Sequence, residues 1–583
     1  MGQRFDTIVV GAGAAGCVVA NRLSSDPARK VLLLEAGRDD PPGSEPANIR
    51  DTFFGVAPYH PDNVWPDLKV RWQPREVPGS TLSPYVQARV IGGGSSINAM
   101  GAIRGLPDDY DGWERQGAAG WGWAGVLPYF RKLERDMDFD GPLHGRSGPV
   151  PIRRLPREVW PPFSRAVAES MQARGLPLAA DMNAEYHDAV FPFPLNNTSS
   201  SRVSMAMAYL SAEVRARPNL TIIGRALVQR VLIEGGRAVG VRSISNGGVA
   251  RDFAGGEVVL SSGTLQTPVL LMRSGVGDPG NLESVGIDVL AAATGIGANL
   301  HDHPFVTVAG YLRRSAKQPD SLRSPTCIAA RHSSRTEVRF PSDLYLGVAG
   351  KVSWHPFGKR LAGLNVVLLG PRSRGKISLA GSRENPEPSF EFNLLKDESD
   401  LRRLGDGFRF IHGIMSTAPV RPLFHAIFAA SFSPRVQRVN RVNWRNWAQS
   451  AALTAVLDCV GPLRAPILDA LVSPDVSLAK IAGDDRLLDA WLRSHATGFF
   501  HPVGSCRMGA EDDPDAVVDV KGRVRGVAGL RIADASVMTA TIRAPTLLTT
   551  IMIAERMADA IIGRDQAAPL GQSVHTLKRS ATT

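Results

Sequence analysis

Three glycines and a carboxylate near the N-terminus have the types and spacing needed to bind a dinucleotide. Gly11, Gly13 and Gly16 form the pattern GxGxxG, and Glu35 follows 19 residues after Gly16. Such glycines permit a tight turn, close approach of the backbone to a pyrophosphate and close packing of helix on strand, while the acid accepts a hydrogen bond from a ribose 2′-hydroxyl. An acid here disfavours a cofactor with a 2′-phosphate. The expected contact residues are Gly11, Gly13, Ala14, Ala15, Gly16, Glu35 and Ala36.

A strand, a helix and a second strand must hold these residues in place. The β-branched run at 7–10 leads into Gly11, an apolar helical stretch follows to residue 23, and a second apolar run at 31–34 ends at Glu35. A helix that begins in this way points its free N–H groups at the phosphates. The order predicts a Rossmann-like unit, and by itself it leaves open whether the dinucleotide is NAD or FAD.

Two further glycine-rich segments lie downstream. Residues 88–98 read ARVIGGGSSIN, and residues 263–268 read GTLQTP and run on to SGVG at 274–277. Backbone N–H groups exposed by consecutive glycines, together with small hydroxyls, can cradle an anionic group or the edge of a flavin. With the N-terminal motif, these segments resemble the signatures of the glucose-methanol-choline (GMC) oxidoreductase family.

The resemblance spans about residues 5–563 and includes GANLHDH at 297–303, SRG at 373–375, HPVGSCRMG at 501–509 and LRIADAS at 530–536. It implies FAD as the cofactor and an α/β plus α+β fold, in which an antiparallel-sheet substrate domain covers a Rossmann-like FAD-binding domain. The expected FAD-binding domain comprises residues 1–155, 215–310 and 496–565. The expected substrate domain comprises 156–214 and 311–495, and residues 566–583 are expected to form a disordered tail.

Site residues follow from the resemblance position by position. It implies that the second glycine-rich segment lies along the pyrophosphate and flavin, that the backbone of Val228 meets the adenine, and that Asp534 approaches the ribityl-phosphate portion. Some relatives tether the flavin to a histidine at the position of Ile97, so the resemblance predicts noncovalent FAD. The implied cofactor contacts are Gly92, Gly94, Ser95, Asn98, Ala99, Met100, Val228, Phe500, Asp534, Ala535 and Thr546.

Alcohol oxidation needs a base for the hydroxyl proton, and a neutral imidazole is the natural one. His501 matches the catalytic histidine of the family, with Phe500 beside the flavin ring. The second active-site position, an Asn or His in relatives, is Pro545 here when the segment before residues 551–555 is aligned without a gap. Proline offers no side-chain hydrogen bond, so the usual two-point grip on the alcohol oxygen is reduced to one unless another residue or a water replaces it.

The favoured function is FAD-dependent oxidation of a primary alcohol to the aldehyde. Similarity to bacterial aryl- and furan-alcohol oxidases at 104–111, 121–130 and 142–145 favours an aromatic or heteroaromatic alcohol. A quinone-linked dehydrogenase of aliphatic alcohols, a hydroxynitrile-lyase-like enzyme without net redox chemistry and an inactive flavin-binding relative are the alternatives. Oxygen and a quinone both remain candidate electron acceptors.

The net charge of +11, from 67 basic and 56 acidic residues, raises the question of a polyanionic partner. Residues 407–457 contain no acid but six arginines, and the tail adds two basic residues, so eight of the eleven excess charges lie in two segments. A nucleic-acid surface needs basic residues that recur across a domain face, so no nucleic-acid partner is expected. The six are Arg409, Arg421, Arg435, Arg438, Arg441 and Arg445.

The arginine-rich segment has three open interpretations: a solvated face, a contact in a homo-oligomer, or peripheral contact with an anionic membrane. If residues 435–445 formed one helix, its four arginines would lie within an arc of about 120°. Trp444 and Trp447 follow at once. Basic helices with tryptophans can lie on anionic bilayers, which would suit a quinone-linked enzyme.

Cysteine usage and the N-terminus indicate the cellular setting. Cys17, Cys327, Cys459 and Cys506 are scattered without metal-ligand spacing, so neither a zinc site nor a disulfide framework is expected. The chain shows neither a secretory signal pattern nor an apolar run of the roughly 18 to 20 residues that span a bilayer. We therefore expect a cytoplasmic protein without a metal, in peripheral contact with the inner membrane if the third interpretation holds.

Overall fold

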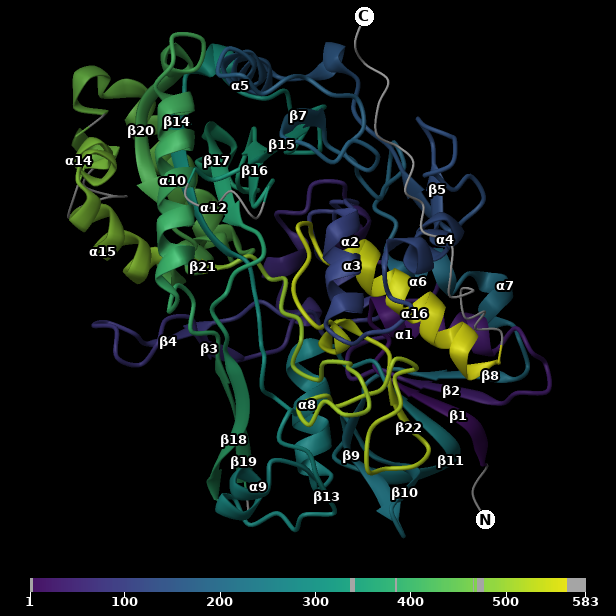
Figure 1. Cartoon of the computed structure of the whole chain (residues 1–583). Coiled ribbons are helices and arrows are strands. Elements are labelled where there is room, and N and C mark those ends of the chain that lie inside the picture. The colour runs from purple at the N-terminus through teal and green to yellow at the C-terminus, as the bar shows by residue number, and fades with distance from the viewer. Residues whose placement is uncertain (1–3, 336–340, 383–384, 465, 469–476, 564–583) are drawn as a thin grey trace, which may run out of the picture.

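Two seven-stranded sheets dominate the computed structural model of the chain (Figure 1). The structure describes residues 4–335, 341–382, 385–464, 466–468 and 477–563. The predicted disordered tail, 566–583, lies outside the described residues.

The first sheet carries the N-terminal motif. Its strands run in the order β8 (Leu220–Ile223), β2 (Val31–Leu34), β1 (Phe5–Val10), β11 (Ala250–Leu260), β10 (Arg237–Ser245) and β9 (Ala226–Glu234), and β22 (Leu530–Ile532) pairs with β11. The strands from β8 to β11 and β22 are parallel, as the buried, apolar sequences of β1 and β2 favour, whereas β9 and β10 are antiparallel. The parallel pairing of β1 with β2 confirms the predicted strand–helix–strand unit.

Helices from the two ends of the chain pack together beside this sheet. Helix α1 (Ala14–Leu23) begins after the glycine turn and lies against α16 (Leu547–Ile561) (Figure 1). The guanidinium of Arg22 donates two hydrogen bonds to the buried carboxylate of Glu555, at 2.6 and 2.8 Å, and the hydroxyl of Tyr209 donates to the same carboxylate. These contacts hold α16 against the C-terminal end of α1.

The second sheet is antiparallel. Its order is β20 (Phe424–Ala430), β14 (Pro304–Leu312), β17 (Leu361–Leu368), β16 (Leu344–Ala349), β15 (Ile328–His332) and β7 (Ala189–Pro192). The short strand β21 (Thr497–Gly498) pairs with the start of β14. Helix α10 (Glu398–Met415) packs on β14, β16 and β17 through side chains buried at helical spacing, Leu401, Leu404, Phe408 and Ile411.

Three smaller sheets and further helices complete the described part of the chain. A four-stranded sheet joins β18 (Lys376–Ser382), β19 (Asn385–Glu391), β3 (Lys69–Arg71) and β4 (Leu82–Pro84), and two pairs join β5 (Glu134–Asp136) to β6 (Val150–Ile152) and β12 (Val276–Gly277) to β13 (Ala291–Ala292). The remaining α-helices are α2 (Ala47–Arg50), α3 (Pro107–Arg115), α4 (Trp123–Leu133), α5 (Pro162–Gln172), α6 (Met205–Tyr209), α7 (Ala212–Arg215), α8 (Gly263–Arg273), α9 (Pro279–Ser284), α11 (Pro434–Asn440), α12 (Trp444–Cys459), α14 (Leu478–Gly483) and α15 (Asp485–His495). Short 3-10 turns include η3 (Gly93–Ser96) and η9 (Ala535–Val537).

This architecture confirms the expected fold class, a mainly parallel Rossmann-like sheet combined with an antiparallel sheet. Strands of the first sheet come from 5–34, 220–260 and 530–532, and those of the second from 189–192, 304–430 and 497–498. The ranges given for the two domains stay a prediction. No helix within the described residues is both long enough and apolar enough to cross a bilayer.

The arginine-rich segment is not one helix, so the single arc considered for residues 435–445 is wrong. Helix α11 ends at Asn440 and α12 begins at Trp444. Between them Arg441 has an extended backbone (φ −56°, ψ 133°), and the side chain of Asn443 accepts a hydrogen bond from the N–H of Asn446 at 2.8 Å. Asparagine is a strong N-cap because its side-chain oxygen satisfies an N–H at a helix start, and it begins a new helix here.

Candidate active site

One cavity of about 790 Å³ is lined by both large sheets. Loops that follow β1, β2, β11 and β22 line one part of it, and β14, β16, β17 and β20 line another. Open parallel sheets bind ligands outside the carboxyl ends of their strands, as this placement provides. The predicted site residues at the wall are Gly11, Gly13, Ala14, Ala15, Glu35, Ala36, Gly94, Ser95, Asn98, Ala99, Val228, Phe500, His501, Asp534, Ala535, Pro545 and Thr546.

Three predicted contacts, Gly16, Gly92 and Met100, lie behind the wall. A Cβ on Gly16 would come within 1.9 Å of the carbonyl oxygen of Gly11, so glycine alone lets α1 begin so close to the turn. Gly92 and Met100 have left-handed backbones, with φ of +83° and +60°, on either side of the loop that lines the cavity. Their direct contact with a cofactor stays a prediction.

The two glycine-rich loops touch backbone to backbone. The N–H of Gly92 donates to the carbonyl of Ala12 at 2.7 Å. A Cβ on Gly93 would lie 2.7 Å from the Cα of Gly13, and Gly93 also has φ of +53°. Side chains are thereby excluded from the junction, so the N–H groups near the start of α1 line the cavity as an open cradle for an anion.

Glu35 organises the cradle from the end of β2. Its two carboxylate oxygens accept hydrogen bonds from the N–H groups of Ala12, at 2.8 Å, and Gly37, at 2.7 Å. Burial raises the pKa of Glu35, against the opposing effect of these two hydrogen bonds. Each oxygen has a second lone pair, so the carboxylate can still accept a hydrogen bond from a ribose hydroxyl in the cavity.

A buried arginine braces the second glycine-rich loop. The guanidinium of Arg202 donates to the carbonyl of Asn98 at 2.6 Å, to its side-chain oxygen at 2.9 Å and to the carbonyl of Ser95 at 3.3 Å. The hydroxyl of Ser95 donates to the carbonyl of Gly92 and accepts from the N–H of Met205. Ser95 is therefore committed to the protein, whereas the side-chain NH2 of Asn98 remains available to a ligand.

Asp534, after β22, is likewise committed to the fold. One carboxylate oxygen accepts from the N–H of Gly263 and the hydroxyl of Thr267, at 2.9 and 2.6 Å, and the other accepts from the N–H of Ser536 at 2.8 Å. Burial raises its pKa against these hydrogen bonds. The carboxylate thus fixes the start of α8 at the cavity wall, where its first N–H groups can meet a phosphate.

These features fit FAD. The glycine cradle suits a pyrophosphate, and Glu35, the predicted acceptor for a ribose hydroxyl, lines the same cavity as Phe500 and His501. Ile97 is buried and offers no nucleophile for a covalent link. One cavity can therefore accommodate both the anionic part and the ring system of FAD.

His501 lies at this cavity because it closely follows β21 in the chain. Strand β21 pairs with β14 through Pro304 and Phe305, and the chain then turns at Phe500, whose φ is +61°. The carboxylate of Asp302 accepts a hydrogen bond from the N–H of His501 at 3.0 Å and from that of His303 at 2.7 Å. Burial raises the pKa of Asp302 to about 7. The carboxylate of Asp302 thus fixes the backbones of both histidines.

The ring of His501 faces a second histidine. Its Nδ1 atom lies 3.0 Å from Nδ1 of His303, and the two rings are nearly perpendicular, at 88°. Burial lowers the pKa of His501 well below its ordinary value and that of His303 to about 4, so both rings are neutral at pH 7. One Nδ1 must then donate to the other. If His501 donates, its Nε2 keeps a free lone pair on a residue that lines the cavity.

Pro545 lies at the same wall, directly before the start of α16. Its ring supplies shape and no hydrogen bond. Pro545 therefore cannot donate the second hydrogen bond expected at this position, and the equivalence of Pro545 to that position stays a prediction.

A polar pair stands on the cavity face of the second sheet. Thr307 of β14 and Asn365 of β17 are paired in register, and the threonine hydroxyl donates to the asparagine side-chain oxygen at 2.7 Å. The side-chain NH2 of Asn365 is then left to donate to a ligand. Apolar wall residues surround the pair, among them Phe305, Ala309, Tyr345, Leu361 and Phe428.

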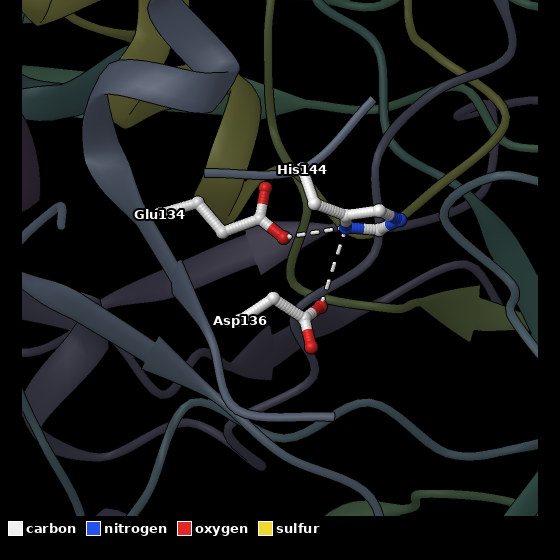
Figure 2. Close-up of side chains that lie close together, drawn as sticks. All are labelled: Glu134, Asp136 and His144. Carbon is white, nitrogen blue, oxygen red and sulfur yellow. Dashed lines mark hydrogen bonds and ion pairs between the residues drawn. The ribbon is translucent and has the colours of Figure 1, made fainter. Parts of the chain in front are cut away.

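Glu134, Asp136 and His144 form a separate buried cluster (Figure 2). None of the three is among the residues that line the cavity. Nδ1 of His144 lies 3.0 Å from Glu134 and 3.4 Å from Asp136, and Nε2 lies 2.8 Å from Asp181. Burial lowers the pKa of His144, but the hydrogen bonds to Asp136 and Asp181 outweigh it and raise the pKa overall. Both ring nitrogens of His144 lie within hydrogen-bond distance of carboxylates, which is the arrangement of a hydrogen-bonded cluster, whereas a metal would need one of those nitrogens as a free lone pair.

Two arginines complete the charge balance of this cluster. Arg154 donates to Asp136 at 2.9 Å and to Asp181 at 2.7 Å, and Arg104 pairs with Glu134. Three carboxylates thus face two guanidinium groups and one imidazole ring. Buried charges are tolerated when they are paired in this way.

Sequence reasoning missed four residues that shape the site: Arg202, His303, Thr307 and Asn365. A signal existed for three of them. His303 ends the segment GANLHDH, and Thr307 and Asn365 are single polar residues in otherwise apolar strands, VTVAGYL and LNVVL. Arg202 lies in a polar turn and has no comparable signal.

Comparison with known proteins agrees with the predicted family. The GMC oxidoreductase models match residues 5–305, for the N-terminal part, and 371–554, for the C-terminal part. The chain is 37% identical over 577 residues to 5-(hydroxymethyl)furfural oxidase of Methylovorus sp. (strain MP688), covering 96% of this chain and 98% of the relative. It is 31% identical to human mitochondrial choline dehydrogenase, covering 96% and 90%.

Among solved structures, pyridoxine 4-oxidase from "Mesorbium loti" superimposes with a TM-score of 0.78 at 26% identity, over 96% of this chain and 99% of that one. The shared fold extends over nearly the whole of both chains.

Proposed function

Because the chain belongs to the GMC oxidoreductase family, whose members bind FAD and oxidise CH–OH groups, we propose that it oxidises an uncharged aromatic or heteroaromatic primary alcohol to the aldehyde, with His501 as the base. The observation that carries the proposal is the neutral His501 ring, held by His303 at the wall of the cavity that fits FAD. The other site residues keep the roles described above.

Proton removal is the step that the chain itself supplies. With the Nδ1 proton of His501 donated to His303, Nε2 accepts the hydroxyl proton of the alcohol. The lowered pKa keeps this nitrogen unprotonated in the resting enzyme. FAD, when bound, supplies the acceptor for the carbinol hydrogen and its two electrons. A noncovalently held flavin is proposed, since Ile97 stands where some relatives attach it.

The lining of the cavity favours an uncharged substrate over choline. Glu35 and Asp534 are the carboxylates among the lining residues, and both serve the cofactor end. A quaternary ammonium near His501 thus meets no other carboxylate among the described lining residues, since Asp302 lies behind His501 and accepts hydrogen bonds from backbone N–H groups. Aromatic rings of the wall, Phe305, Tyr345 and Phe428 among them, suit a flat apolar ring, and the NH2 of Asn365 suits an oxygen on that ring.

Anaerobic mixing of the holoenzyme with a panel of alcohols tests this function. The panel contains benzyl alcohol, 5-(hydroxymethyl)furfural, pyridoxine, hexanol and choline. Loss of the oxidised-flavin absorbance with the aromatic members, and faster than with hexanol or choline, is expected. Unbleached flavin together with cyanohydrin cleavage would establish the lyase alternative instead. Reoxidation in air and with a soluble quinone then identifies the electron acceptor, for which oxygen is proposed on the similarity to the furfural oxidase.

A further inference from the structure

Four arginines, two tryptophans and two valines form an exposed surface at the junction of α11 and α12. We name it the Arg/Trp surface; it consists of Arg435, Val436, Arg438, Val439, Arg441, Trp444, Arg445 and Trp447. Trp444 is 75% and Trp447 52% exposed, although tryptophan normally hides most of its ring. Large apolar side chains brought to the surface beside basic ones point to a binding partner.

Hydrogen bonds join helices α11 and α12 where they meet. The side-chain NH2 of Asn446, in the first turn of α12, donates to the carbonyl of Arg438 at 3.0 Å and to that of Arg441 at 2.9 Å. These bonds hold the start of α12 against the end of α11. The exposed side chains of both helices therefore belong to a single patch.

The four arginines of this patch make no ion pair within the described residues. Acidic residues are absent from the sequence between 407 and 457, so no carboxylate from this stretch neutralises them. Arg409, which lies outside the patch, is paired with Asp485. The positive charge of the patch is thus available to an external anion.

The patch adjoins the cavity. Val436 and Asn440 of α11 both line it, and Val436 is also 38% exposed. Anchoring contacts fix α11 there: the indole N–H of Trp354 donates to the carbonyl of Asn440, and the side chain of Gln437 donates to the carbonyl of Pro84. A surface that binds the patch therefore lies next to the cavity wall formed by α11.

We propose that the Arg/Trp surface docks the protein on an anionic lipid surface. Exposed tryptophan and valine side chains enter the headgroup layer, while arginine guanidinium groups pair with lipid phosphates. Docking places the α11 side of the cavity at the bilayer, where apolar alcohols and lipid-soluble electron acceptors concentrate. This inference does not depend on the proposed oxidation.

A second copy of the chain fits the patch less well. A two-fold interface brings the same patch of both copies together, so the arginines of one copy face those of the other. Like charges repel, and interface cores are depleted of unpaired charge. An anionic bilayer instead complements all four arginines at once.

Vesicle flotation of the full-length holoprotein tests the docking. The vesicles contain phosphatidylcholine alone or with phosphatidylglycerol. Wild type should float with the vesicles that contain phosphatidylglycerol and not with those of phosphatidylcholine alone. Binding to the anionic vesicles should be about a hundredfold weaker, or weaker still, in the variant Arg435→Gln/Arg438→Gln/Arg441→Gln/Arg445→Gln. Trp444→Ser/Trp447→Ser should also bind more weakly. The matched control removes four exposed arginines elsewhere, Arg157, Arg165, Arg230 and Arg251, and should float like wild type.

Three outcomes would overturn the proposal. Wild type that does not float with anionic vesicles has no docking surface, and equal loss in the control variant means adsorption by net charge. A sedimentation change from dimer to monomer in the tryptophan variant, without effect on flotation, identifies an interface between copies.

Flavin reduction measured without vesicles reports on the proposed oxidation separately, because none of the substituted residues lines the cavity.

Discussion

The Nδ1 atoms of His303 and His501 lie 3.0 Å apart, so the two rings share one proton between them. Phe499 packs edge-on against His501, with ring centroids 5.1 Å apart, and His303 is fully buried. His303 thus lies inside the protein and His501 at the cavity wall, and burial lowers the pKa of both rings so that both are neutral. The orientation of one shared proton decides whether His501 can act as a base.

Replacing His501 removes that base. His501→Ala should lower the rate constant of flavin reduction by an aromatic alcohol by about a hundredfold or more, which is what a positioned general base contributes. Anaerobic stopped-flow absorbance measures it. His187→Ala, at an exposed histidine, is the matched control and should reduce at the wild-type rate. An unchanged rate in His501→Ala would remove it from the mechanism.

His303 should act as a positioning residue. His303→Phe loses the acceptor for Nδ1–H of His501 and should slow flavin reduction by about ten- to a hundredfold, as loss of a partner behind a functional histidine does. Its pH profile should also change. In wild type the rate stays level as the pH falls below 6.5, because the pKa of His501 is lowered. Without its partner the ring of His501 can turn. The low-pH part of the rate–pH profile of His303→Phe should therefore differ from that of wild type.

Rescue separates positioning from simple packing at His303. Asparagine can offer an acceptor oxygen near the former Nδ1, so His303→Asn should recover most of the rate and the wild-type pH profile. A His303→Asn variant as slow as His303→Phe, with equal flavin content, would count against the shared proton.

Asn365 should contribute to substrate binding rather than to proton transfer. Asn365→Leu keeps the side-chain volume and removes the NH2 donor. KM for 5-(hydroxymethyl)furfural should rise about five- to tenfold while kcat changes little, because about one hydrogen bond to the substrate is lost. Benzyl alcohol has no ring oxygen to accept that bond and serves as the control substrate. Equal KM changes for both alcohols would refute a specific contact.

The junction of the glycine loops should be sensitive to a single methyl group. Gly93→Ala places a Cβ 2.7 Å from the Cα of Gly13, so the purified variant should carry much less FAD, measured by the absorbance ratio of flavin to protein. Gly248→Ala is the control: it has the same kind of left-handed backbone, φ +77°, with open space around its Cβ. Comparable flavin loss in both would indicate backbone strain instead of blocked contact.

The His144 cluster should make stability fall with rising pH. The pKa of His144 is raised by Asp136 and Asp181, so its contribution is full below pH 6.5, its ordinary pKa, and is lost as the pH rises through the raised value. Tm measured from neutral to alkaline pH should therefore decline more steeply in wild type than in His144→Gln. EDTA should leave Tm unchanged, and a Tm decrease with EDTA would favour a bound metal.

Local patterns in the sequence determined the cofactor end of this protein. GxGxxG, the strand before it and Glu35 lie within about thirty residues, and glycine spacing expresses a steric requirement that holds in any chain of this topology. Motif identity likewise placed His501, Phe500 and Pro545, which all line the cavity. The fold class followed from the same motifs.

Tertiary structure alone decided the contacts that govern reactivity. His303 and His501 are 198 residues apart and meet because β21 pairs with the start of β14. Thr307 and Asn365 share a hydrogen bond through the β14–β17 register, and Arg202 reaches Asn98 across 104 residues. No spacing rule encodes these pairs, because each depends on the cumulative geometry of the strands and turns between its members. The break between α11 and α12, by contrast, has a local cause. The N-cap at Asn443 starts a new helix, although the spacing of the arginines suggested one continuous helix.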